Sequence, residues 1–235
     1  MNAVIDIGNT RSKLGLFTGP DDGLEVSYLK TEEILAFLAS NVVEKVLISN
    51  VADSNAVVGK IRESVRELLV LSIKTPLPIR TSYKTPETLG VDRLAACVGA
   101  RKIKSGNILV IDAGSCITYD LLTKENVHKG GIISPGIEMR LKAMHTFTSN
   151  LPLVPVKAVP LEGESTEHCL QSGAINGVLA EMKGIIQEYL VRYEDLSVII
   201  GGGDAEFFDK NLELDTFVVS NLVLEGLRAI FVYNE

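Results

Sequence analysis

The chain is poor in the residues that build metal, disulfide and membrane sites: it has no tryptophan, three histidines and three cysteines. Cys97, Cys116 and Cys169 are odd in number and form no CxxC pair, which argues against a disulfide framework or a zinc site. No apolar run approaches the ~18 residues that a membrane span needs. Asp6 interrupts the first apolar run, so we expect no signal peptide. These absences predict a soluble cytoplasmic protein without a membrane partner.

Basic residues are outnumbered, since 23 Lys and Arg against 30 Asp and Glu give a net charge of −7. Nucleic-acid binding needs a basic face, so this charge argues against DNA or RNA as a partner. Nucleotides stay open, because their phosphates need only a few local donors and a cation. With 235 residues, 46% of them hydrophobic, the chain is long enough for one large domain or two of ordinary size.

Apolar periodicity predicts a mixed series of strands and helices. In the first half we expect strands over 2–8, 12–17, 24–30 and 45–51, helices over 31–40 with Thr31 as N-cap and over 53–68, and an irregular passage over 75–86. Then we expect a helix over 90–103, strands over 107–122 and 127–137, a helix over 166–193, a strand over 196–203 and a helix over 220–231.

The opening motif occurs twice. "NILVIDAGSCITYDLL" aligns with "NAVIDIGNTRSKLGL" at a constant offset of 106, which places Asp112 on Asp6 and Gly114 on Gly8. Two such motifs, each opening a β-meander, indicate a duplicated domain. We place the boundary near Ser105, which predicts domains over 1–105 and 106–235 and a ligand cleft between them.

The two Asp–Gly turns suit a phosphate chain. Glycine exposes backbone N–H groups and lets a phosphate approach without a Cβ in the way. Side-chain donors lie in both turns: Asn9, Thr10, Lys13 and Ser115. Asp6 and Asp112 cannot bind phosphate themselves, but they can hold a cation that bridges to it, directly or through water. A single turn of this kind could be an ordinary hairpin, whereas the pair favours phosphate binding.

"GVDR", residues 90–93, places an acid and an arginine at the start of a predicted helix. Helix N-termini favour anions, and the fork of Arg93 suits a carboxylate. Asp92 is placed to act as a base or to orient a hydroxyl. The alternative is charge stabilisation of the helix end by the acid, with a solvated arginine.

"GGGD", residues 201–204, follows an apolar strand and opens a helix. Consecutive glycines would let an adenine ring lie against the backbone. The alternative is a strand-to-helix turn that needs a positive φ. Together with two phosphate turns, the nucleotide interpretation is favoured.

Five motifs, in this order and spacing, resemble those of the type III pantothenate kinases: "DIGNTRSK", "GVDR", "DAGSCITYD", "GGIISPG" and "STEHCLQSG". The resemblance covers nearly the whole chain. The Asp–Gly turns alone are similar to those of the wider acetate/sugar kinase, Hsp70 and actin superfamily, whereas the GxDR segment points to this family. The resemblance implies an α/β fold of two RNase H-like (actin-like ATPase) domains, each a mixed β-sheet flanked by helices, with ATP between them.

The resemblance also implies an activity: ATP-dependent phosphorylation of pantothenate to 4′-phosphopantothenate, the first step of coenzyme A biosynthesis, with Asp92 as the general base. Residues implied to bind ATP are Asp6, Ile7, Gly8, Asn9, Thr10, Arg11, Ser12, Lys13 and Ser115. Residues implied to bind pantothenate are Tyr83, Gly90, Val91, Asp92, Arg93 and Thr166. Asp112 would hold a monovalent cation (K⁺ or NH₄⁺), and Asp6 would hold Mg²⁺. A homodimer is implied as well.

Two turns depart from the family pattern. Ser115 and Cys116 stand where a threonine and a small residue are commoner, and Gly201 stands where a threonine often leads the adenosine turn. Neither departure removes a proposed catalytic group. Three other functions fit parts of the pattern, namely another kinase of the superfamily, a phosphohydrolase and a non-catalytic regulator.

Overall fold

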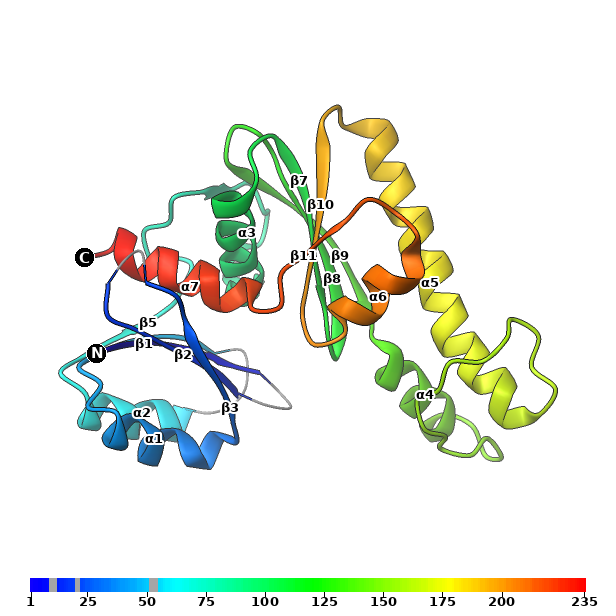
Figure 1. The fold of residues 1–235 in the computed structure, drawn as a ribbon, viewed down its shortest axis with the longest axis horizontal. Helices are drawn as coiled ribbons and strands as arrows, with labels where there is room; N and C mark the ends of the chain where they lie inside the picture. Colours follow the sequence, from blue (N-terminus) through cyan, green and yellow to red (C-terminus); the bar gives the residue numbers. More distant parts are fainter. Residues whose placement is uncertain (9–11, 20–21, 51–54) are drawn as a thin grey trace. The chain divides into compact units, whose positions relative to one another are not determined.

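The structure is a computed structural model that describes residues 1–8, 12–19, 22–50 and 55–235 (Figure 1). Its strands are β1 (Asn2–Ile7), β2 (Ser12–Phe17), β3 (Glu25–Leu29), β4 (Lys45–Asn50), β5 (Glu67–Val70), β6 (Arg80–Thr81), β7 (Asn107–Ala113), β8 (Cys116–Leu122), β9 (Val127–Pro135), β10 (Leu196–Gly201) and β11 (Phe217–Val218). Its helices are η1 (Thr31–Glu33), α1 (Ile34–Ser40), α2 (Asn55–Ser64), η2 (Pro86–Thr88), α3 (Val91–Ile103), α4 (Ile137–Thr146), α5 (Thr166–Arg192), α6 (Ala205–Leu212) and α7 (Leu222–Tyr233).

Two helix ends predicted from the sequence are wrong. The N-cap of the first helical segment is Lys30, because Thr31 is already the first residue of η1. The helix predicted over 53–68 ends at Ser64, and the residues from Glu67 onward form β5 instead. The predicted N-terminal residue of that helix, Asp53, lies outside the described residues.

The two sheets repeat one topology. Their strand orders are β3-β2-β1-β4-β5 and β11-β10-β7-β8-β9-β6. β1 pairs antiparallel with β2 and parallel with β4. Reversed and without β6, the second order becomes β9-β8-β7-β10-β11, in which β10 is again parallel to β7 and to β11. This match in sheet order confirms the duplication predicted from the two Asp–Gly motifs.

The chain forms two compact units. Unit 1 comprises Met1–Ser105, Leu122–Gly130 and Asn221–Glu235, and unit 2 comprises Gly106–Leu121 and Gly131–Ser220. The first change of unit falls where the sequence places the domain boundary, whereas residues 122–130 and 221–235 group with unit 1. The domain bounds of 1–105 and 106–235 stay a prediction.

Unit 1 is a helix–sheet–helix sandwich. Helices α1 and α2 cover one face of the first sheet and α7 covers the other (Figure 1). On the α7 face, the ring of Phe231 meets the ring of Phe17 edge to face at 5.2 Å between centroids. Helices α3 and α7 touch through backbone, because a Cβ at Gly226 would lie 1.8 Å from the carbonyl oxygen of Ala95. This close packing holds α3, whose first turn carries the GVDR motif.

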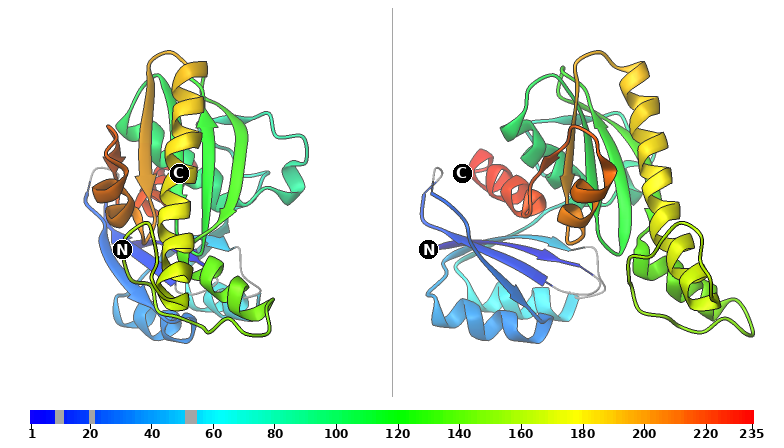
Figure 2. Two further views of the ribbon diagram at one scale, coloured as in Figure 1. Left: turned by 90° about the vertical axis from the view of Figure 1, so that its right-hand side faces the viewer. Right: turned by 45° about the vertical axis from the view of Figure 1, so that its right-hand side comes forward.

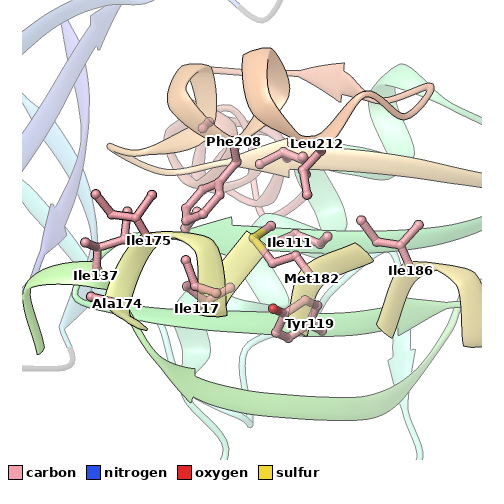
Figure 3. Close-up of a cluster of buried hydrophobic side chains, with 14 of the residues drawn as sticks. Ile111, Ile117, Tyr119, Ile137, Ala174, Ile175, Met182, Ile186, Phe208 and Leu212 are labelled. Carbon is pink, nitrogen blue, oxygen red and sulfur yellow. The ribbon is translucent and has the colours of Figure 1, made fainter. Parts of the chain in front are cut away.

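Unit 2 places α5 along its part of the second sheet (Figure 2). Figure 3 shows Ile111 and Ile117 of the sheet together with Met182 and Ile186 of α5 and Phe208 of α6 in one buried cluster. Apolar side chains at helical spacing on α5 therefore pack with residues of the sheet and α6 in the core of this unit. In the part of the chain that the structure describes, no helix is both long and apolar enough to cross a membrane.

Candidate active site

The first Asp–Gly turn follows β1 in unit 1. Asp6 lies directly opposite Lys13 in the antiparallel β1–β2 pair, so the two side chains face the same side of the sheet. Both residues are partly buried. Ser12 is fully buried, and its Oγ lies 3.3 Å from Oγ1 of Thr31. Three residues of the predicted ATP-binding segment lie outside the described residues: Asn9, Thr10 and Arg11.

The second Asp–Gly turn follows β7 in unit 2. Here the N–H of Gly114 donates to the carbonyl of Cys116 at 3.0 Å, and the N–H of Gly136 donates to the carbonyl of Ser115 at 3.0 Å. A Cβ at Gly136 would lie 2.1 Å from the carbonyl oxygen of Gly114, so only glycine fits against the turn. Ser115 is exposed. The turn is thus fixed by backbone contacts, and its serine faces outward.

The predicted adenine turn lies beside Asp112 in unit 2, since Gly201 of β10 is opposite Asp112 of β7 in the parallel register. Gly202 has φ +95°, and a Cβ there would lie 2.2 Å from the carbonyl oxygen of Ala113. The need for a positive φ therefore accounts for Gly202. Gly203 is different: among the described residues, no heavy atom outside its own neighbours lies within 4 Å of its Cβ position. This glycine leaves open space for a ligand.

An acidic residue ends the same turn. Asp204 is the N-cap residue of α6. Burial, and secondarily the charge of Glu138, raises the pKa of Asp204 above its usual value. The turn therefore combines a glycine that leaves room for a ligand with a carboxyl group that is partly withdrawn from water.

The GVDR motif forms the start of α3 in unit 1, as the sequence predicts. Gly90 is the N-cap residue and Val91 is the first residue of the helix. The backbone N–H of Arg93 donates to Oδ1 of Asp92 at 2.9 Å. A Cβ at Gly90 would lie 2.5 Å from that same oxygen, so the glycine makes room for the carboxylate. The geometry fixes the Asp92 side chain at the first turn of the helix, partly exposed.

Arg93 is only 6% exposed, which shows that the alternative of a solvated arginine is wrong. Its guanidinium carbon lies 5.8 Å from the centroid of the Tyr83 ring, within range of a cation–π interaction. The structure thereby brings together two residues that were predicted to bind substrate. Tyr83 is partly buried, and its ring stacks on that of His128 with centroids 6.2 Å apart.

The sequence motifs assign no functional role to His128, and its contact with Tyr83 was missed. The available signal was the motif "VHKGGIISPG", in which Gly130 follows two residues after the histidine. Gly130 has φ +86°, and a Cβ there would lie 3.0 Å from the Tyr83 ring. A glycine that faces an aromatic ring could have been inferred only with the pairing of these two segments known.

Thr166 is the first residue of α5 in unit 2 and is exposed. Ser165 before it is the N-cap residue, whose Oγ accepts the N–H of His168 at 3.2 Å. This cap stabilises the first turn of α5, which carries the Thr166 hydroxyl.

The proposed oxygen ligands for a cation are two carboxylates, Asp6 and Asp112, one beside each Asp–Gly turn. Within the described ranges, no group of three or more His, Cys, Asp or Glu side chains could hold a metal ion. Asp6 and Asp112 are each partly exposed at the end of a strand. Mg²⁺ is usually bound by one or two carboxylates together with water and substrate phosphates. The donor set therefore fits a hard cation that reaches the protein with its phosphate ligand.

The repeated mixed sheets with helices on their faces define the class of fold, which is that of the actin-like sugar kinases. A structure described as a 2-dehydro-3-deoxygalactonokinase from Sinorhizobium meliloti matches with a TM-score of 0.59 at 13% identity, covering 100% of this chain and 98% of the other. A structure named for the Baf family of transcriptional activators, from Campylobacter jejuni, matches with a TM-score of 0.66 at 25% identity, covering 99% and 98%. These matches confirm the predicted fold class.

Sequence comparison gives the family. A profile described as type III pantothenate kinase matches residues 3–188. The type III pantothenate kinase of Christiangramia forsetii is 41% identical over 241 residues, which span 100% of this chain and 99% of that relative. The chain therefore belongs to the type III pantothenate kinase family, and the resemblance seen in the five motifs is confirmed.

Proposed function

We propose that the chain transfers the γ-phosphoryl group of ATP to the primary hydroxyl of pantothenate, giving ADP and 4′-phosphopantothenate in the first step of coenzyme A biosynthesis. Family membership over the full length supports this reaction. At the level of residues, the supporting observation is the Arg93 guanidinium, buried against Tyr83 and adjacent in the chain to the Asp92 carboxylate. A fixed cation beside a carboxylate suits an acceptor with an acid at one end and a hydroxyl at the other.

Asp92 is proposed as the general base. It would accept the hydroxyl proton while the substrate oxygen bonds to the γ-phosphorus, and the bridging oxygen would leave on ADP with its electron pair. The bond from the N–H of Arg93 at 2.9 Å holds the carboxylate at the first turn of α3. Phosphoryl transfer demands mainly positioning and charge neutralisation, so a carboxylate held in this way is sufficient for the proton.

Arg93 and the N-terminal turn of α3 are proposed to bind the carboxylate of pantothenate. A guanidinium can donate two parallel N–H bonds to a carboxylate, and the helix end adds partial positive charge. Because Arg93 is 6% exposed, its pairing with an anion is weakened little by water. The other proposed substrate contacts are Tyr83, Gly90, Val91 and Thr166.

ATP is proposed to bind through the two Asp–Gly turns. The residues concerned are Asp6, Ile7, Gly8, Asn9, Thr10, Arg11, Ser12, Lys13 and Ser115. Mg²⁺ at Asp6 and K⁺ or NH₄⁺ at Asp112 would neutralise phosphate oxygens when bound. The exposed Gly203 supports a place for the adenine. A homodimer and a cytoplasmic location are proposed from the family resemblance and the cysteine content.

The experiment is ADP release by the purified protein with Mg-ATP, with and without pantothenate, in potassium and then in sodium buffer. The proposal expects turnover that depends on pantothenate and is faster in potassium. ADP release that is indifferent to pantothenate would favour a phosphohydrolase. Release that requires a sugar or acetate instead would favour another kinase of the superfamily. No turnover under any condition would favour a regulator, a function suggested by the name of the Campylobacter jejuni structure.

A further inference from the structure

Tyr83 is held by the buried His128 and the partly buried Thr81, which the proposed reaction does not use. They belong to unit 1 and come from β6 and the first residues of β9. These strands pair in parallel, with Thr81 opposite His128. The pairing joins segments that are 47 residues apart in the sequence. It places a threonine hydroxyl and an imidazole next to the tyrosine that stacks on Arg93.

A chain of hydrogen bonds links His128 to the backbone of Tyr83. The N–H of Tyr83 donates to Oγ1 of Thr81 at 3.1 Å, and the same oxygen lies 3.0 Å from Nδ1 of His128. A threonine hydroxyl can take part in more than one hydrogen bond, so Oγ1 can join the N–H of Tyr83 to Nδ1 of His128. The N–H of Ser82 also donates to the carbonyl of His128 at 2.9 Å. The backbone that carries Tyr83 is therefore tied to His128 at two points.

The imidazole ring also contacts the tyrosine ring. The two planes are inclined by 25° with centroids 6.2 Å apart, which is a stacked arrangement. Gly130, whose missing Cβ would lie 3.0 Å from the ring, lets the backbone approach at this point. His128 itself is 0% exposed, so any effect that it has on a ligand passes through neighbouring residues such as Tyr83.

We infer that His128 is a positioning residue for pantothenate: through Thr81 and Tyr83 it fixes the Arg93 guanidinium that binds the substrate carboxylate. The inference rests on the proposed function. An arginine that is already ordered before binding loses less side-chain entropy when the carboxylate arrives, which strengthens binding of the substrate. Asp92 accepts the backbone N–H of Arg93, and substitutions at Thr81 and His128 leave both groups of that bond in place, so we expect the proton transfer itself to be unaffected. Disturbing this chain of contacts should raise the KM for pantothenate and leave kcat unchanged.

The test compares four variants of the full chain. Thr81→Val removes the shared hydroxyl at nearly constant volume, Thr81→Ser restores it, and His128→Phe keeps a ring but removes Nδ1. The matched control is Thr75→Val, because Thr75 is buried in the same unit and its Oγ1 likewise accepts a backbone N–H, that of Ser72 at 3.0 Å. For each variant the measurements are kcat, the KM for pantothenate, the KM for ATP and the melting temperature.

We expect Thr81→Val and His128→Phe to raise the KM for pantothenate by about 3- to 20-fold, with kcat and the KM for ATP within about twofold. Thr81→Ser should return the KM to the wild-type value, and Thr75→Val should lower the melting temperature without moving any KM. The inference is overturned if both Thr81→Val and His128→Phe keep the wild-type KM, or if kcat and both KM values change together. Wild-type protein without pantothenate-dependent turnover would instead overturn the proposed function, and the inference with it.

Discussion

Replacing Gly226 by alanine should loosen the helix pair that supports the GVDR motif. The added Cβ would lie 1.8 Å from the carbonyl oxygen of Ala95 and 3.0 Å from the backbone nitrogen of Gly99. Ordinary contacts begin near 3.4 Å, and both neighbours are backbone atoms of α3 that cannot rotate away. Helices α3 and α7 must therefore separate by more than an ångström or bend.

The expected size of the effect follows from two opposing contributions. Alanine favours a helix over glycine by ~1 kcal/mol, whereas overpacking of a close contact costs ~1–3 kcal/mol and occasionally more. At Gly226 the contact is with rigid backbone, so we take an overpacking cost of about 2–4 kcal/mol, which leaves a net loss of unfolding free energy of about 1–3 kcal/mol after the propensity gain of alanine. For a chain of this length, that loss lowers the melting temperature by roughly 2–12 °C.

The assay is thermal unfolding of Gly226→Ala beside Gly59→Ala. Gly59 lies in α2 of the same unit and is exposed, and among the described residues no atom lies within 4 Å of its Cβ position. This control should melt at or slightly above the wild-type temperature, because only helix propensity changes. If Gly226→Ala melts at or above the wild-type temperature, the account of α3–α7 packing is incorrect.

Three further predictions concern single side chains. Asp92→Asn should keep the wild-type melting temperature and ATP affinity but lose at least about 100-fold in kcat in the ADP-release assay, and full activity would remove the base role. Asp204 has a pKa raised above that of the unfolded chain, so its contribution to stability is lost as the pH rises through the folded-state pKa. Asp204→Asn should therefore melt above wild type at pH 7, with a difference that shrinks toward the usual pKa of 3.8, and a constant difference would contradict the assignment. Ser165→Ala should lower the free energy of unfolding by ~1 kcal/mol, because it removes the N-cap of α5, whereas Ser165→Asp should keep the cap and the stability. Thermal unfolding of both variants tests this.

The duplicated motif made the architecture predictable. Asp6 and Asp112 each follow an apolar run, and the strands that carry them, β1 and β7, are the central members of the same strand order in both sheets. The sequence could not assign α7 to unit 1, because the apolar face of an amphipathic helix does not show which sheet the helix packs against. The early end of α2 at Ser64 was missed, since the residues that follow suit a helix as well as a short strand.

The site was predictable in its residue types but not in its contacts. Arg93 in "GVDR" could have been solvated or buried, and only the position of Tyr83 decides between the two. Tyr83 in turn depends on β6, a strand of two residues in a passage that sequence analysis treats as irregular. Its pairing with His128 joins distant segments, and periodicity within either segment gives no information about such a partner.

The most direct test of the central claim is to offer the purified protein Mg-ATP with a mixture of pantothenate, glucose and acetate, and to identify the phosphorylated product by mass spectrometry. The account predicts that 4′-phosphopantothenate is formed and that the other two acceptors stay unmodified. Phosphorylated glucose or acetyl phosphate as the main product, or inorganic phosphate without any phosphorylated acceptor, would contradict it.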